Sequence, residues 1–364
     1  MAFILQRLIF PKFGPREPPV LSSRIPVIGH LISLMREKTS FYRRLYRDNS
    51  LPICTLPMLN GKLISSAMRS KDISFDPFAL EIHDSLMGKN LDNMVNTGLG
   101  RLSSRLNDVR SDTSMEIPYI FTWIRDLMFE SSMKSLYGST DPMTMEGMEK
   151  ISQRLLRIIL PFYASGSDKM EDVSALIRNR AGLKRKLGLS EEAICKLELI
   201  LPWVATTNTI PTALWFFAQT LSRPEWAMPT ISVSRLRKEC PALLTCYHET
   251  NRLCNDTTDN RRVMRDTILQ DPVEGKKYLL TKGTNIQWCG SVTQLDQKVS
   301  GPKSDEFNPN RWIINPSKES DYRKSMLPFG GGKALCPGRH FAEAEILGFL
   351  SGLMLGFELK AFRC

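Results

Sequence analysis

The chain has 364 residues, of which 42% are hydrophobic, so it is long enough to bury a large core. Its formal net charge of +11 is typical of a solvated basic surface, or of one that docks to an acidic protein or an anionic membrane, and the absence of a basic stripe interleaved with aromatics argues against nucleic acid. Eight scattered cysteines without zinc-binding spacing argue for a reducing compartment and against a disulfide scaffold.

The first 29 residues divide into two segments. Residues 1–10 are apolar apart from Gln6 and Arg7, and they fall short of the ~20 residues that a membrane-spanning helix needs. They indicate the remnant of an anchor, an interfacial segment or a frayed terminus. Residues 11–29 contain five prolines and predict a stiff extended connector. Residues 30–364 contain no strong linker and predict one large domain.

Several elements are predicted along the chain from apolar spacing and turn residues. They are a short basic helix over 40–48, a hairpin over 56–66 around Asn60-Gly61, an irregular stretch over 75–97, a helix over 121–137 ended by Gly138, and a helix over 144–162 that stops near Pro161. The basic run 178–186 indicates a solvated face or a partner-docking one.

A long helix is predicted from Ser190 to about Leu221. Ser190 has the side chain of an N-cap, and acidic residues follow it in the first turn. Pro202 and Pro211 each remove a backbone hydrogen bond and should kink the helix. Between them lies the polar run 205–209, for which the plain interpretation is a polar kink in a core helix.

A second helix is predicted over 241–253. Glu249 and Arg252 lie three residues apart on it, so their side chains meet on one face. Taken alone, this spacing describes an ordinary surface ion pair.

Residues 329–342 form a glycine-rich loop that leads into an apolar helix. Three consecutive glycines precede Cys336, and Pro337 and Gly338 follow it. Backbone N–H groups and the helix dipole at that position favour a thiolate over a thiol. A thiolate held in such a loop suits an axial position of a haem iron. The plain alternative is a buried structural cysteine after a glycine turn.

This loop resembles the cysteine-ligand loop of the cytochrome P450 superfamily. The family pattern is Phe, two residues, Gly, three residues, Cys, one residue, Gly, and Phe329, Gly332, Cys336 and Gly338 match it. Three further family motifs occur in order before it, at 205–209, 249–252 and 307–311. The resemblance implies a mainly α fold with small β-sheets in a single large domain. It also implies haem b between the distal helix and the helix after Cys336, with Cys336 as the axial ligand of the iron.

The resemblance implies further roles for single residues. Arg311, in a Phe-x-Pro-x-Arg segment, would join Glu249 and Arg252 in a buried structural triad, and Arg262 would meet a haem propionate. The segment WVATTNTIPTALWF resembles the branch that contains cholesterol 7α-hydroxylase and prostacyclin synthase. There Asn208 replaces the acid of typical members and Thr209 keeps the hydroxyl, which implies catalytic roles for both.

The implied activity is insertion of one oxygen atom from dioxygen into a lipophilic substrate, sterol-like or a secondary metabolite. The resemblance implies NADPH-cytochrome P450 reductase as the electron-donating partner, which delivers electrons from NADPH, and a location on the cytosolic face of the endoplasmic reticulum membrane. Two alternatives stay open: an isomerase acting on a peroxide substrate, and an inactive haem-binding remnant. The second is suggested by the chain's end 28 residues after Cys336, without the family's terminal strands, which predicts an incomplete C-terminus.

Overall fold

The computed structural model describes residues 16–19, 21, 30–49, 54, 56, 82, 84–109, 114–140, 153–222, 241–255, 258–271, 274–313, 325–331 and 335–359. The chain forms two compact units, each assembled from separate stretches of sequence. The first consists of 1–73, 255–306 and 316–330, and the second of 74–254, 307–315 and 331–364. The predicted apolar segment 1–10 lies outside the described residues, as does almost all of the hairpin predicted over 56–66.

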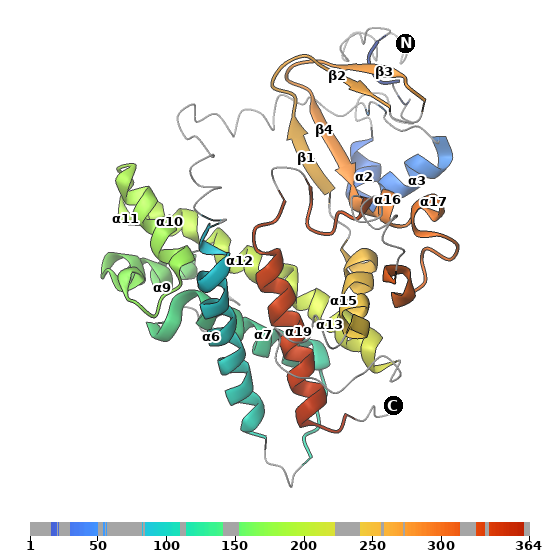
Figure 1. The fold of residues 1–364 in the computed structure, drawn as a ribbon. Coiled ribbons are helices and arrows are strands. Elements are labelled where there is room, and N and C mark those ends of the chain that lie inside the picture. Colours follow the sequence, from blue (N-terminus) through green and yellow to red (C-terminus); the bar gives the residue numbers. More distant parts are fainter. Residues whose placement is uncertain are drawn as a thin grey trace. The chain divides into compact units, whose positions relative to one another are not determined.

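The first unit contains short helices and two small antiparallel sheets (Figure 1). In one sheet β1 (Thr258–Arg262) pairs with β4 (Asn285–Cys289), and in the other β2 (Thr267–Gln270) pairs with β3 (Lys277–Leu280). The helices are α2 (Leu31–Glu37), α3 (Thr39–Asn49), α16 (Gly290–Gln294) and α17 (Gln297–Ser300). Helix α3 confirms the short basic helix predicted over 40–48.

The second unit is helical. Its elements are α6 (Gly88–Asn107), α7 (Ile120–Tyr137), α9 (Gln153–Ala164), α10 (Ala175–Lys186), α11 (Glu191–Glu198), α12 (Ile200–Thr207), α13 (Thr209–Leu221), α15 (Pro241–Cys254) and α19 (Arg339–Gly356), with the 3-10 turns η1 (Gly138–Thr140), η2 (Ser167–Lys169) and η4 (Pro309–Trp312). Together the two units confirm the predicted fold class, mainly α with small sheets. None of the described helices is long and apolar enough to span a lipid bilayer.

Helices α6, α7 and α19 carry much of the core of this unit. Helix α6 packs against both α7 and α19, and the three lie side by side (Figure 1). The contact between α6 and α7 depends on Gly98, because a Cβ there would overlap the Ser135 hydroxyl and lie 3.0 Å from the Ser131 hydroxyl. The absence of a side chain at Gly98 therefore brings the two backbones close together.

The prediction of an irregular stretch over 75–97 is wrong for its C-terminal part, where α6 begins at Gly88. The buried residues of α6 recur every four positions, at Met94, Gly98, Leu102 and Leu106, which is one face of a helix. Two of the glycines and the asparagines of α6 have low intrinsic helix propensity. The burial of this apolar face outweighs that low propensity. The prediction that a helix stops near Pro161 is also wrong, since α9 contains Pro161 and continues to Ala164.

The basic run on α10 is mostly paired inside the protein, which corrects both of its sequence interpretations. Arg178 donates to the backbone carbonyls of residues 170, 171 and 173. Arg180 and Lys184 both pair with the fully buried Glu198, the last residue of α11. Arg185 pairs with Asp168 and with Glu191. These ion pairs join α10 to α11 and η2. They therefore stabilise the start of residues 190–221, the stretch predicted as one long helix, which we call the distal segment.

Candidate functional site

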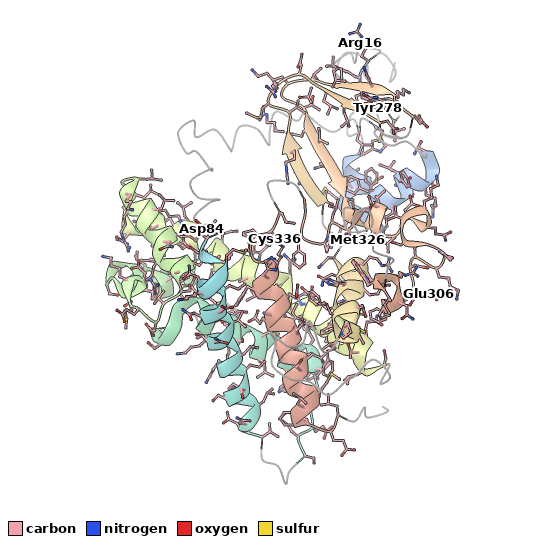
Figure 2. All side chains as sticks on the ribbon, in the orientation of Figure 1. Arg16, Asp84, Tyr278, Glu306, Met326 and Cys336 are labelled. Carbon is pink, nitrogen blue, oxygen red and sulfur yellow. The ribbon has the colours of Figure 1, made fainter. Side chains whose placement is uncertain are left out.

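Cys336 lies directly before the long helix α19. Gly338 is the N-cap of α19, so Cys336 lies two residues before the N-cap (Figure 2). The backbone N–H of Ala342 closes the first turn by donating to the Gly338 carbonyl at 2.9 Å. The Arg339 guanidinium donates to the Cys336 carbonyl at 3.0 Å, which fixes the loop to the helix start. The half-buried Cys336 side chain thus stands at the positive end of an eighteen-residue helix.

The pKa of the Cys336 thiol corrects one expectation. Burial raises the pKa of the thiol, while the backbone N–H groups of Gly338 and Arg339 and the positive charge of Arg339 lower it. The lowering causes are those expected from the loop, but burial outweighs them. Without a bound cation, the thiol form is therefore favoured, and a metal ion at the sulfur would reverse this balance.

The surroundings of the sulfur fit a haem. A Cβ added at Gly338 would lie 3.8 Å from the Cys336 sulfur, in ordinary contact with it. Because residue 338 is glycine, no side chain from this position touches the sulfur. A soft sulfur donor beside a helix N-terminus suits iron, and the N–H groups that lower the thiol's pKa would stabilise the ligating thiolate.

The other predicted residues of the cysteine loop lie before it in sequence. Phe329 is half-buried in the first unit, in a turn closed by the Gly330 N–H donating to the Leu327 carbonyl at 3.1 Å. Gly330 has a φ of 74°, a conformation that favours glycine. Gly332 lies outside the described residues. Arg262 is also in the first unit, where it is exposed at the end of β1 and pairs in register with Asn285.

The distal segment is three helices rather than one. Helix α11 ends at Glu198 and α12 at Thr207, which are four residues before Pro202 and Pro211 respectively. A proline ring clashes with the carbonyl four residues earlier, so each preceding helix ends at that residue. The prediction that both prolines interrupt the helix is confirmed, and so is Ser190 as the N-cap, whose hydroxyl accepts a hydrogen bond from the Ala193 N–H.

Asn208 forms the break between α12 and α13. Its side chain is exposed and makes no capping hydrogen bond to α13. Its carbonyl accepts from both the N–H and the hydroxyl of Thr212, at 3.2 and 2.8 Å. The break therefore presents the Asn208 amide away from the helix backbone.

Thr209 differs from the other buried threonines of the distal segment. Thr206, Thr212 and Thr220 each donate their hydroxyl to the carbonyl four residues earlier. Within the described residues, no hydrogen bond is made by the Thr209 hydroxyl, although the residue is only 7% exposed. Thr209 is thus the buried threonine of this segment whose hydroxyl the helix does not use.

A buried charge network lies in the same unit. Arg252 donates to both oxygens of the Glu249 carboxylate at 2.8 Å. The same carboxylate accepts from the Asn308 N–H at 2.9 Å and the Trp312 indole N–H at 3.0 Å, and Arg311 lies 3.3 Å away as an ion pair. This confirms the predicted triad and adds Trp312 as a donor. The network fastens η4 to α15.

One buried polar pair was not predicted from the sequence. Glu345 on α19 accepts a 2.7 Å hydrogen bond from the Ser132 hydroxyl on α7. The signal was present, because Glu345 directly precedes the apolar stretch 346–350 in the helix that follows Cys336.

Comparison with known proteins points to the same family as the sequence motifs. The family model Cytochrome P450 matches residues 232–363. A Cytochrome P450 monooxygenase of Gibberella zeae is 28% identical, with 99% of this chain and 84% of that protein covered. A 25-hydroxycholesterol 7-alpha-hydroxylase of Rattus norvegicus is 25% identical, covering 66% and 64% of the two chains.

The fold also matches a solved structure. Retinoic acid bound cyanobacterial CYP120A1 superposes with a TM-score of 0.67 and 16% identity, covering 94% of this chain and 92% of that one. The alignment with the Gibberella protein is 443 positions long, so that relative has internal segments that this chain lacks. The four motifs in family order, the family model over residues 232–363 and the relatives along the chain all indicate the cytochrome P450 superfamily of oxidoreductases, within which the chain resembles the cholesterol-hydroxylating branch.

Proposed function

We propose that this protein is a haem-thiolate monooxygenase that inserts one oxygen atom from dioxygen into a lipophilic, sterol-like substrate or a secondary metabolite. Cys336 is the proposed axial ligand of haem b, and Phe329, Gly332, Gly338 and Arg262 are the proposed haem-contacting residues. The observation that carries this proposal is the placement of the Cys336 thiol at the N-terminus of α19, beside Gly338.

The protein's part on the proximal side is to hold a thiolate. Gly338 and Arg339 have backbone N–H groups that lower the pKa of the Cys336 thiol, and these groups would stabilise a thiolate that ligates a bound metal ion. The Glu249 network keeps α15 and η4 in fixed positions within the unit that carries the loop. When bound, haem supplies the activation of dioxygen, for which thiolate ligation favours O–O cleavage.

The protein's part on the distal side is to order water and protons. The Thr209 hydroxyl is not used by the helix, so it can hold a water molecule. Asn208 has no ionisable proton at neutral pH, and its amide can orient that water but cannot release a proton. We therefore infer that Thr209 and ordered water, rather than a carboxylic acid, hold the protons that the reaction consumes.

Electrons come from NADPH through NADPH-cytochrome P450 reductase in this proposal, at the cytosolic face of the endoplasmic reticulum. The net charge of +11 supports docking to an acidic partner and to an anionic membrane surface. The sterol-like substrate class is supported by the resemblance of the segment around Asn208 and by the rat relative's name.

The test is reconstitution with NADPH, reductase and ¹⁸O₂ against a panel of oxysterols and terpenoid secondary metabolites. A monooxygenase should give a product that carries one ¹⁸O atom and should need all three components. Formation of product from an organic peroxide without reductase would instead identify an isomerase. Haem binding without either product would identify the inactive form.

A further inference from the structure

Glu345 is a buried carboxyl group on the helix that follows Cys336. It is 2% exposed and lies on α19, six residues after the helix begins. Its Oε1 accepts the 2.7 Å hydrogen bond from Ser132 on α7. Among the described residues, Oε2 of Glu345 and the hydroxyl of the neighbouring Ser131 have no hydrogen-bond partner.

The electrostatic surroundings favour the neutral acid. Burial raises the pKa of Glu345 to about 7, and the hydroxyls of Ser132 and Ser131 lower it by less. An ionised carboxylate buried beside hydroxyls alone would lack most of its solvation. Glu345 is therefore mostly protonated below about pH 7 and mostly ionised above it.

Several charged groups on the helices around α19 pair with groups other than Glu345. Helix α13 carries no titratable side chain. Arg101 and Arg105 of α6 pair with Glu130 of α7 at the surface. On α15, Glu249 and Arg252 pair with each other, and the His248 ring contacts the rings of Tyr247 and Trp312. None of these groups contributes to the pKa of Glu345, which leaves the two serines as its polar neighbours.

Helix α7 is a common support for both proposed walls of the haem site. It packs against α12 and α13, which flank Asn208, and Thr209 is the first residue of α13. It also contacts α19 through the hydrogen bond to Glu345 and through Trp123 and Phe349, whose ring centroids are 6.4 Å apart. A helix is stiff over six residues, about 9 Å, so a constraint at Glu345 acts on the position of the helix start.

We propose that Glu345 is a positioning residue for the Cys336 loop, because its hydrogen bond with Ser132 holds α19 against α7. This inference rests on the proposed role of Cys336 as the haem ligand. Ionisation of Glu345 at higher pH leaves a buried charge, which opposes the packing of α19 on α7.

The sign of the pH dependence follows from proton binding. Glu345 has a raised pKa in the folded state, so between about pH 4.5 and 7 the folded state binds more protons than the unfolded state. The contribution of protonated Glu345 to the stability of the folded protein is fully present below about pH 4.5. It is lost as pH rises through about 7. A glutamine at this position keeps the hydrogen bond and does not titrate.

The first experiment uses the protein without haem. The melting temperatures of wild type and Glu345→Gln should be similar near pH ~5, and the variant should melt increasingly higher as pH approaches ~8. Ser135→Ala is the matched control, because Ser135 bonds to the carbonyls of Met94 and Ser131 and not to α19. The difference in melting temperature between Ser135→Ala and wild type should not change with pH. Parallel pH profiles for wild type and Glu345→Gln would overturn the protonation argument.

The second experiment uses the haem-loaded protein and follows the thiolate-type Soret band of the CO complex. In wild type, the share of the non-thiolate form should rise as pH passes about 7. Glu345→Gln should remove this rise, and Ser132→Ala should increase the non-thiolate share severalfold relative to Ser135→Ala. If all variants match Ser135→Ala, Glu345 does not position the loop, although Cys336 still ligates haem. If wild type never shows the band, the proposed function fails, and the melting experiment still decides whether Glu345 is a neutral buried acid.

Discussion

Arg252 donates two hydrogen bonds of 2.8 Å each to Glu249, and both side chains are fully buried. Lys303 and Glu306 have the same three-residue spacing, but their side chains are 73% and 59% exposed. The same local pattern thus occurs both in the core and at the surface. The difference between them is burial and the additional donors that Glu249 receives from Asn308 and Trp312.

We expect Glu249→Ala to destabilise the fold by about 3–5 kcal/mol, because it removes the buried carboxylate that pairs with the buried Arg252. Glu306→Ala is the matched control and should cost less than about 1 kcal/mol, since exposed ion pairs contribute little. Urea unfolding of both variants measures the difference. Equal losses would show that the Glu249 network does not support the fold.

Two glycines of α6 should respond in opposite directions to alanine. Gly98→Ala should destabilise by about 1–3 kcal/mol, since the methyl group would overlap the Ser135 hydroxyl and force α6 away from α7. Gly100→Ala should stabilise by about 0.5–1 kcal/mol, because its position has no atom within 4 Å and alanine favours the helix. Thermal melting of the two variants distinguishes them. A gain of stability for Gly98→Ala would refute the close packing of the two helices.

Thr209→Val should uncouple the proposed reaction. With reductase, NADPH and dioxygen supplied, the variant should consume NADPH at a rate comparable to that of wild type. It should release more hydrogen peroxide and less product, because the Thr209 hydroxyl that orders water is lost. Thr212→Val removes a hydroxyl that already bonds to the Asn208 carbonyl, so it should keep its coupling nearer to wild type. Unchanged coupling in Thr209→Val would remove Thr209 from the proposed proton path.

The strongly periodic helices were predicted from sequence almost to the residue. Helix α7 was predicted over 121–137 and runs from Ile120 to Tyr137, and α15 was predicted over 241–253 and runs from Pro241 to Cys254. In both cases an apolar repeat is bounded by a clear stop or start residue. Pro202 and Pro211 likewise end the preceding helix four residues earlier, whereas Pro161 lies inside α9 without ending it.

Features that depend on tertiary contacts were not predictable. Helix α6 contains helix-disfavouring glycines, and one of them, Gly98, is there because α7 lies against it. The basic run of α10 shows its charges in the sequence, but not that Glu198 and Asp168 neutralise part of them. The pKa of Cys336 was predicted in the wrong direction, because burial cannot be read from the loop sequence. Ser132 and Glu345 are 213 positions apart, and nothing in their local sequence pairs them.

The most direct test of the proposed haem-thiolate site is the difference spectrum of the reduced protein with carbon monoxide. Wild type and Cys254→Ala, which changes a half-buried cysteine on α15, should both show the thiolate-type Soret band. Cys336→Ala should fold, as shown by an unchanged far-ultraviolet circular dichroism spectrum, and should lack that band. A thiolate-type band that persists in Cys336→Ala would contradict the assignment of Cys336 as the haem ligand.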